Sequence, residues 1–286
     1  MATEPVEKDP VERDPVGKRV TALAVYPVKG CHRLELPTAT VEPWGLAGDR
    51  RWMMVDADGV GITQRDTSRL TQLACRLRPG GLELAAPGLP PLSVDEPTNG
   101  PKEFVRVFRH QAAVPARIAE TEWSSAFLGR AARLVWQADP TGRPIESHAG
   151  DGDRVSFADG FPLLLANEGS LSALNDWLAE AGDEPVPMTR FRPNVVVGGA
   201  APWAEDGWLG RRLRIGEVTF RAAKSCARCL VTTIDQETGE KGGQPLRILG
   251  RHRRYADGLL FAINLIPETA GVLRLGDPLS VALGVS

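Results

Sequence analysis

Cysteine and histidine are scarce in this sequence, with four residues of each among 286. Four cysteines in a chain this long do not form a disulfide scaffold, and a reducing compartment keeps them as thiols. Only one C-x-x-C pair is present, Cys226 and Cys229, whereas a structural zinc site needs four ligands. Cys31, Cys75 and the histidines show no partner spacing. The scarcity therefore disfavours a zinc domain, and burial is the default role of each cysteine.

Long apolar runs and a charge imbalance are also missing. No run approaches the roughly 18 residues that span a bilayer, and the N-terminus lacks the apolar segment of a signal peptide. The formal net charge is -2, so the overall field attracts neither nucleic acid nor an anionic membrane. We therefore expect a cytoplasmic protein that binds neither of them.

In the first half of the chain, turn residues recur at the short intervals that are typical of a small β domain. Residues 1–17 alternate acids with proline and carry almost no apolar side chains, which predicts a disordered arm. Short strand-like stretches follow to about residue 118, separated by Gly, Pro and Asp, with a hairpin turn at Asp58-Gly59. This spacing predicts a β-barrel or sandwich.

A helix and a domain boundary are expected next. Trp123, Phe127 and Ala131 share one helical face after Thr121, which predicts a helix over 121–134. The stretch "QADPTGRPIESHAGDGD" is polar and rich in Gly and Pro, as linkers between domains are. We expect one domain over 18–144 and a second over 145–286.

The second half is also mainly β. The run "PLLLA" predicts a buried strand, and "EGSLSALNDWLAEAG" predicts a helix whose Leu171, Leu174 and Leu178 share a face, with Gly182 at its C-terminus. Several strands with hairpin turns follow. The expected fold class is mainly β with a few helices (α+β).

The pair in "KSCARCLVTT" is open to several interpretations. Thioredoxin-type chemistry needs a helix N-terminus at the pair, whereas "LVTTID" is β-branched and favours a strand. A single thiolate that binds a soft metal needs no second cysteine if a cofactor brings the other ligands. An anionic cofactor would also need basic side chains. Candidates beside Gly, Pro or turns are Lys29, Arg50, Arg51, Arg192 and Arg228, although an isolated arginine is usually a solvated surface residue.

Several motifs occur together and in order along the chain. They are "YPVKGC", "GLAGDRRWMMVDADG" with "TQRD", "FADGFPLLLAN", "FRPNVVV", "WAEDGW", "IGEVTF", "CARCLVTTIDQETGE" and "LRLGDPLSV". The ordered set resembles the MOSC family over roughly residues 18–283, in particular members with an N-terminal MOSC β-barrel, including the mitochondrial amidoxime-reducing component. The resemblance implies an N-terminal β-barrel domain followed by a MOSC β-barrel domain.

The same resemblance implies a molybdenum cofactor (Mo-molybdopterin) whose metal is bound by the cysteine after the arginine, here Cys229. Cys226 matches a family cysteine that is not a ligand. Phosphate and pterin contacts map onto nine residues: Lys29, Gly30, Arg50, Asp159, Gly160, Phe161, Arg192, Ala227 and Arg228. The "FADGFP" loop departs from the mitochondrial relatives, which carry small hydroxyl residues where Gly160 and Phe161 stand.

The implied activity is reduction of N-hydroxylated compounds such as amidoximes, hydroxylamines and N-hydroxylated bases. The sequence offers no iron–sulfur cysteine set and no room for an appended ferredoxin-like domain. We therefore expect electrons from a separate ferredoxin-type or flavin reductase. The alternative is a carrier of molybdenum cofactor, or of sulfur as a persulfide on Cys229. A β-protein that has lost its cofactor is a third interpretation, which the intact basic set disfavours.

Overall fold

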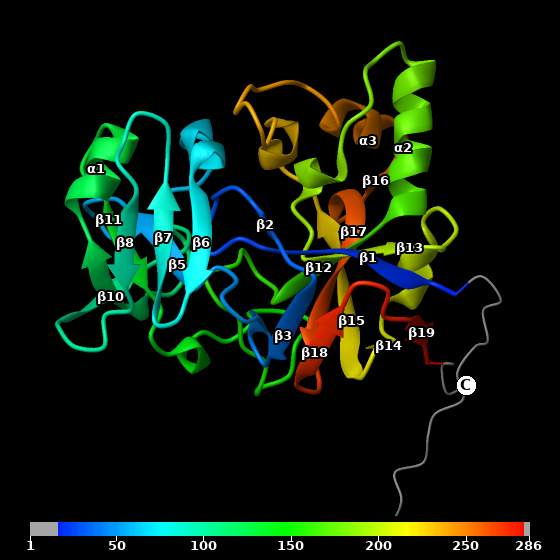
Figure 1. Cartoon of the computed structure of the whole chain (residues 1–286). Helices are drawn as coiled ribbons and strands as arrows, with labels where there is room; N and C mark the ends of the chain where they lie inside the picture. Colours follow the sequence, from blue (N-terminus) through cyan, green and yellow to red (C-terminus); the bar gives the residue numbers. More distant parts are fainter. Residues whose placement is uncertain (1–16, 283–286) are drawn as a thin grey trace, which may run out of the picture.

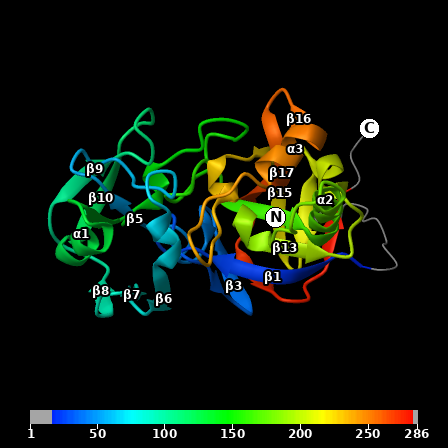
Figure 2. The same ribbon diagram turned by 90° about the horizontal axis from the view of Figure 1, so that it is seen from above.

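The protein consists of two lobes that lie side by side (Figures 1 and 2). The computed structural model describes residues 17–282, so the expected disordered arm lies outside the described residues except for Gly17. The described part is mainly β with three α-helices, which confirms the expected fold class. One lobe contains β5 to β11 and α1, and the other contains the largest sheet with α2 and α3.

The largest sheet has nine strands and forms the body of the second lobe. Among its described strand pairs only β12 and β13 are parallel, and the others are antiparallel. Its strands, in chain order, are β1 (Arg19–Val25), β2 (Leu34–Glu35), β12 (Leu163–Asn167), β13 (Val195–Gly198), β14 (Arg212–Ile215), β15 (Val218–Ala227), β16 (Arg254–Tyr255), β17 (Gly258–Pro267) and β19 (Leu279–Val281).

Three smaller sheets complete the β structure. One contains β3 (Thr38–Glu42), β4 (Gly45–Leu46) and β18 (Gly271–Arg274). The first lobe contains a four-stranded sheet of β5 (Trp52–Val55), β9 (Lys102–Val105), β10 (Val114–Glu120) and β11 (Arg133–Trp136), and a three-stranded sheet of β6 (Ala74–Arg78), β7 (Gly81–Ala85) and β8 (Leu92–Asp95). The hairpin turn expected at Asp58-Gly59 is present, with Gly59 at φ 75°.

The sheets do not follow the expected division at residue 144. Strand β1 pairs with β13 of the second half, and β3 pairs with β18. The reason is apolar burial, because Val20, Leu23 and Val25 of β1 enter the core of the large sheet. The chain therefore begins in the second lobe and then builds the first.

Residues at both ends of α2 explain where this helix begins and ends. The run "PLLLA" is the buried strand β12, as expected, and α2 (Glu168–Glu180) follows it directly. The side chain of Asn167 accepts a hydrogen bond from the N–H of Gly169 and so caps the helix. Gly182 lies just past the helix at φ 74°, where glycine is favoured.

The helix expected over 121–134 is much shorter. Helix α1 (Glu122–Leu128) ends at Gly129, which adopts the left-handed conformation at φ 67°. Trp123 and Phe127 are buried as expected, but Ala131 lies outside the helix because the chain turns into β11 at residue 133. Helix α3 (Leu246–His252) packs against α2 and β17.

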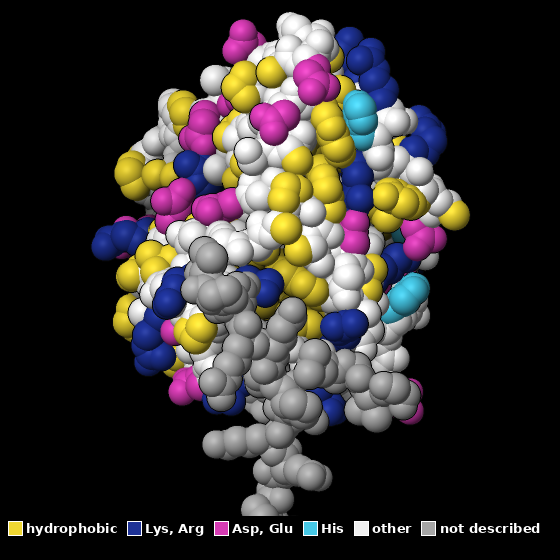
Figure 3. Space-filling model, turned by 90° about the vertical axis from the view of Figure 1, so that its right-hand side faces the viewer, with side chains coloured by type: hydrophobic (Ala, Val, Ile, Leu, Met, Phe, Trp, Pro, Cys, Tyr) yellow, Lys and Arg dark blue, Asp and Glu magenta, His cyan; other side chains and the backbone are white. Residues whose placement is uncertain are grey.

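Five 3₁₀ turns connect these elements: η1 (Ser68–Gln72), η2 (Pro140–Gly142), η3 (Met188–Phe191), η4 (Ala204–Trp208) and η5 (Leu230–Thr233). On the face that Figure 3 shows, hydrophobic, basic and acidic side chains are interspersed. Within residues 17–282, no helix has the length and hydrophobicity to cross a membrane.

A buried carboxyl group anchors η4 to the start of α2. Both hydrogen bonds to Glu205 end on Oε2, from Asn167 Nδ2 at 2.9 Å and from Ser170 Oγ at 2.9 Å. Oε1 is buried without a partner. Burial raises the pKa of Glu205, against the opposing effect of these two hydrogen bonds.

Glu205→Gln is expected to raise Tm at pH 8 more than at pH 4.5. The folded protein keeps the Glu205 proton to a higher pH than the unfolded chain, so wild-type stability falls as pH rises through the folded pKa. Glutamine stays neutral at both pH values. Its oxygen can take the place of Oε2 and accept both hydrogen bonds, and its NH₂ group then takes the place of Oε1. Thermal unfolding at both pH values measures the effect, with exposed Glu180→Gln as control. A gain that is independent of pH would contradict this account.

Candidate functional site

One cavity of about 340 Å³ lies between the two lobes, and all ten predicted site residues line it. The first half contributes Lys29, Gly30 and Arg50. The second half contributes the others: Asp159, Gly160, Phe161, Arg192, Ala227, Arg228 and Cys229. Of the basic residues considered from the sequence, Arg51 lies elsewhere, bonded to the carbonyl of Gln137.

Positive charge dominates the lining. Six cationic side chains face a single carboxylate, that of Asp159; the cations are Lys29, Arg50, Arg65, Arg192, Lys224 and Arg228. Buried cations need anionic or hydrogen-bonding partners, because burial without them costs free energy. The cavity is thus suited to an anionic ligand with many acceptor atoms.

Tyr26 is the platform on which two of the arginines lie. The guanidinium carbon of Arg50 is 4.4 Å from the centre of its ring, and that of Arg192 is 4.0 Å away. The buried Tyr26 hydroxyl donates to the carbonyl of Pro193 at 3.1 Å, which ties β1 to the segment before β13. Stacking fixes the guanidinium planes and leaves their N–H groups free to bond at their edges.

The same two arginines have strained backbones. Arg50 adopts φ 49° and Arg192 φ 56°, a region that non-glycine residues rarely occupy. Such strain persists only where surrounding contacts fix it, and it is concentrated at functional sites. Gly30 also has a positive φ of 83°, and a Cβ there would lie 3.0 Å from a Leu70 methyl. At Gly160 a Cβ would meet no protein atom within 4 Å, so the fold does not require glycine there.

Each arginine has a polar partner that orients it. Arg50 Nη1 bonds to Asp49 Oδ2 at 2.5 Å and to Asn194 Oδ1 at 3.1 Å. Arg192 Nη1 bonds to Gln236 Oε1 at 2.7 Å. Arg192 Nη2, however, is buried without any hydrogen-bond partner. An unpaired guanidinium N–H beside a cavity is a ready donor for a bound acceptor.

Lys29 is bonded to the loop that precedes β12. Its ammonium bonds to the carbonyl of Phe157 at 2.9 Å and to the carboxylate of Asp159. Burial lowers the pKa of Lys29 to about 8, although Asp159 opposes this shift. Lys29 therefore loses its charge within a pH range that is easily reached in solution.

The two cysteines of the pair have different partners. Cys229 Sγ accepts a hydrogen bond from Arg65 Nη2 at 3.1 Å. Cys226 Sγ is instead 2.8 Å from Arg228 Nη1, and the other Nη of Arg228 bonds to the carbonyl of Phe191. Both cysteines line the cavity, but Cys226 is held by Arg228 and Cys229 lies beside Arg65.

The strand expected after Cys229 is wrong. Residues 230–233 form η5 instead, because the hydroxyls of Thr232 and Thr233 bond back to the carbonyls of Cys229 and Leu230 at 2.9 and 2.8 Å. Such side-chain bonds compete with strand pairing. The turn is too short to provide the helix N-terminus that thioredoxin-type chemistry uses.

Four residues that the sequence did not single out organise the site: Arg65, Tyr26, Arg143 and Gln236. Arg65 lies in the "TQRD" motif and contacts both Cys229 and Asp159. Arg143 donates to the carbonyls of Ala158 and Asp159 and so shapes the "FADGFP" loop. Tyr26, Arg65 and Gln236 lie within the ordered motifs, and this was the signal in the sequence that could have indicated a role in the site. Arg143 lies outside the motifs, so the sequence gave no such signal for it.

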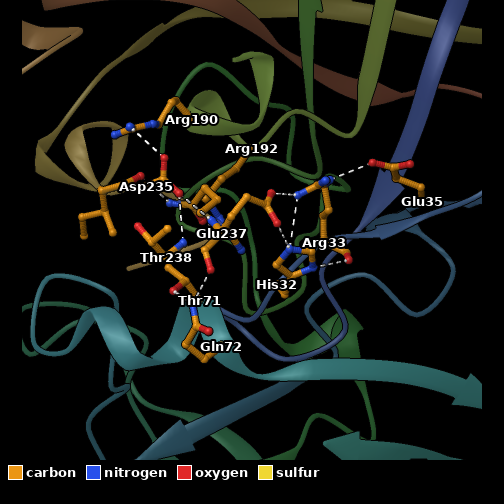
Figure 4. A network of polar contacts seen from close by, with 12 residues as sticks. His32, Arg33, Glu35, Thr71, Gln72, Arg190, Arg192, Asp235, Glu237 and Thr238 are labelled. Atoms are coloured by element: carbon orange, nitrogen blue, oxygen red, sulfur yellow. Dashed lines mark hydrogen bonds and ion pairs between the residues drawn. The ribbon is translucent and has the colours of Figure 1, made fainter. Parts of the chain in front are cut away.

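Polar contacts of the loop after η5 join the two lobes (Figure 4). Glu237 accepts hydrogen bonds from His32 Nε2 at 2.9 Å and from Arg33. Gln72 Nε2 donates to the carbonyl of Glu237 at 2.6 Å. Beneath them, Gln64 and Gln236 exchange two hydrogen bonds of 2.9 and 3.0 Å. Since Gln236 also holds Arg192, docking of the lobes and orientation of the site are coupled.

No three His, Cys, Asp or Glu side chains meet as a metal site within the described residues. Cys31, which follows the Lys29-Gly30 pair, is fully buried in the core of the first lobe. A metal at Cys229 would therefore need most of its ligands from another molecule.

Family models cover most of the chain. The MOSC N-terminal beta barrel domain matches residues 17–131, and the MOSC domain matches residues 152–280. The chain belongs to the MOSC family. This MOSC protein thus has both domains in the order that the sequence motifs indicated.

Curated relatives extend over nearly the whole MOSC protein. Mitochondrial amidoxime reducing component 2 of Rattus norvegicus is 32% identical over 91% of this chain and 82% of its own. Mitochondrial amidoxime-reducing component 1 of Homo sapiens is 29% identical over 91% of this chain and 81% of its own. Molybdenum cofactor sulfurase of Oryza sativa subsp. japonica is 30% identical over 85% of this chain, but over only 32% of its own length.

Sulfate affinity of the cavity is expected to fall several-fold as pH rises from 7 to 9. The Lys29 ammonium loses its proton in this range. Because sulfate is attracted to the charged ammonium and not to the neutral amine, it binds less tightly above pH 8. Lys29→Met should weaken binding at pH 7 and flatten the pH dependence. Isothermal titration calorimetry of both proteins measures this. Equal affinity and equal pH dependence in the two proteins would show that Lys29 does not face the anion.

Proposed function

We propose that this protein is a molybdenum-cofactor-dependent oxidoreductase that reduces N-hydroxylated compounds with electrons from a separate redox protein. The observation that carries the proposal is the position of Cys229, whose thiol accepts a hydrogen bond from Arg65 in a cavity lined by six cations. Cys226 lines the same cavity but is bonded to Arg228. The relatives named amidoxime-reducing component and molybdenum cofactor sulfurase support the same class.

The donor set fits the cofactor. A thiolate is the soft ligand that molybdenum accepts, while Lys29, Arg50 and Arg192 are suited to phosphate and pterin acceptors. The unpaired Nη2 of Arg192 gives a specific donor that a bound acceptor would satisfy. In this assignment the cofactor contacts are made by Lys29, Gly30, Arg50, Asp159, Gly160, Phe161, Arg192, Ala227 and Arg228.

Reduction of the N–O bond follows a simple balance: R–NH–OH, two electrons and two protons give R–NH₂ and water. When bound, the cofactor supplies the two-electron chemistry. The protein's own residues fix and neutralise that group, and they orient the substrate. Arg65 is placed for the last role, because its guanidinium lies beside both Cys229 Sγ and the Asp159 carboxylate, with side-chain exposure of 35%.

The second candidate is a carrier of the cofactor or of sulfur. Cys229 would then act as a nucleophile and bear a persulfide. Arg65 Nη2 would lie beside the reacting sulfur in either case. Elemental analysis and mass spectrometry of protein from a cofactor-producing host separate the two. About one molybdenum per chain supports the enzyme, and metal-free protein with a persulfide supports the carrier.

Cys229→Ser is expected to abolish N-reductive activity and molybdenum retention, while Cys226→Ser retains much of both. Both thiols line the cavity, but the Cys226 thiol is engaged by Arg228, whereas the Cys229 thiol lies beside Arg65 and Asp159 is within reach of the same guanidinium. Reduced viologen as donor and metal analysis of the purified variants test this. An inactive Cys226→Ser beside an active Cys229→Ser would reverse the assignment.

A basic surface next to the cavity supports a separate, acidic electron donor. Residues 241–258 contain four exposed Lys or Arg and one Asp, in a chain with a net charge of -2. A fifth cation, Arg253, is buried and paired with Asp206. Lys241 pairs across a bridge with Ile234 just after η5, and Gly258 lies against Ala227 of the cavity. The exposed side chains of Leu230 in η5 (66%) and Tyr255 in β16 (49%) add apolar surface. Basic and apolar side chains together steer and bind an acidic partner.

The protein alone is expected to fail with NADH and to succeed with reduced viologen or a reduced [2Fe–2S] ferredoxin. The double variant Arg251→Glu, Arg254→Glu should slow the ferredoxin-driven rate at low salt several-fold, because both side chains are exposed on this surface. Its viologen-driven rate should match wild type. Arg76→Glu, on β6 of the other lobe, is the matched charge reversal. NADH-driven turnover by the pure chain would refute the need for a partner.

A further inference from the structure

A second and larger cavity adjoins the first. Its volume is about 780 Å³, within the usual size of a small-molecule pocket. Thr63, Arg65 and Asp159 line both cavities, so the Arg65–Asp159 pair forms their common wall. Arg65 also touches Cys229 Sγ, and a molecule in the second cavity that reaches past this wall arrives at the sulfur. Of the ten predicted site residues only Asp159 lines it.

The charges around the second cavity are largely neutralised within the protein. Asp56 lies 3.7 Å from Arg109. The carboxylate of Asp66 accepts from both the N–H and the hydroxyl of Thr63, at 2.8 and 2.9 Å. Asp159 is paired with Lys29 and Arg65. The lining as a whole has three carboxylates and three guanidinium groups, since Arg65, Arg109 and Arg130 face Asp56, Asp66 and Asp159. Little net charge is left for an ionic ligand, so the cavity favours a neutral one.

Aromatic rings provide the remaining surface. Phe108 and His110 stack in parallel with their centres 5.8 Å apart, on the segment between β9 and β10. The cationic groups of Lys29 and Arg65 lie 5.0 and 5.2 Å from the centre of Phe108. This ring therefore extends from the cations of the first cavity into the second. A further flat π system can stack on such a pair, and cations that lie over a ring face attract its π electrons.

We propose that the second cavity binds the flat aromatic substituent of an N-hydroxylated substrate, with the N–OH group directed past Arg65 toward Cys229. Phe108 and His110 are the binding surface for this substituent, and both lie outside the ten predicted site residues. This inference rests on the proposed function for the reaction, but the binding step can be measured without turnover.

The first test compares two substrates with reduced viologen as donor: benzamidoxime, which has a ring, and hydroxylamine, which has none. Phe108→Ala should lower the ratio of kcat/KM for benzamidoxime to that for hydroxylamine about tenfold, mainly through KM. Phe108→Trp should restore most of the ratio. Phe104→Ala removes an exposed ring from neighbouring β9 and is the control. An unchanged ratio in Phe108→Ala would overturn the proposal, because the ring would then serve only the structure.

The second test needs no cofactor. Saturation-transfer NMR on cofactor-free protein should detect benzamidoxime, with ring protons receiving most of the transfer. Binding should weaken in Phe108→Ala and His110→Ala and stay at the wild-type level in Phe104→Ala. Absence of binding by folded wild-type protein, or equal binding by all variants, would overturn the assignment. Specific binding without turnover of either substrate would refute the proposed reaction and support the aromatic site.

Discussion

The ring of Tyr26 and the guanidinium groups of Arg50 and Arg192 form the stack around which the site is arranged. Three charged or polarisable groups in contact inside a protein require partners, because an unpaired buried charge is costly. Asp49 and Asn194 provide them for Arg50, and Gln236 provides one for Arg192. These partners come from both halves of the chain. The electrostatic requirement of the stack therefore fixes how the lobes meet, and the cavity lies where they meet.

The ordered motifs were sufficient to place ten side chains in one cavity, although their chemical roles stay predictions. Lys29, Arg192 and Cys229 stood out because their residue types suit anions and soft metals. The sequence did not single out Tyr26, Arg65 or Gln236. Nothing in their local sequence shows that a ring lies under two arginines or that two glutamines pair across the lobes. Such contacts depend on the long-range register of strands, which the sequence pattern does not specify.

Local chemistry explains where the expected secondary structure differed. Gly129 ended α1 early, because a left-handed residue stops a helix irrespective of the apolar periodicity beyond it. Thr232 and Thr233 have high strand propensity, yet their hydroxyls bond to nearby carbonyls and form η5. Intrinsic propensity was outweighed in both cases by one specific contact. The second case matters for function, because η5 begins directly after Cys229.

The pairing of β1 with β13 has a consequence for biosynthesis. The two strands are separated in the chain by about 175 residues, as the contact between Thr21 and Val196 illustrates. During translation β1 leaves the ribosome first, and its apolar side chains have no sheet to join until most of the chain has been made. Contacts between such distant segments form slowly and expose apolar surface in the meantime. The second lobe therefore closes only after β13 has been made, and the apolar side chains of β1 stay without their sheet partner until then.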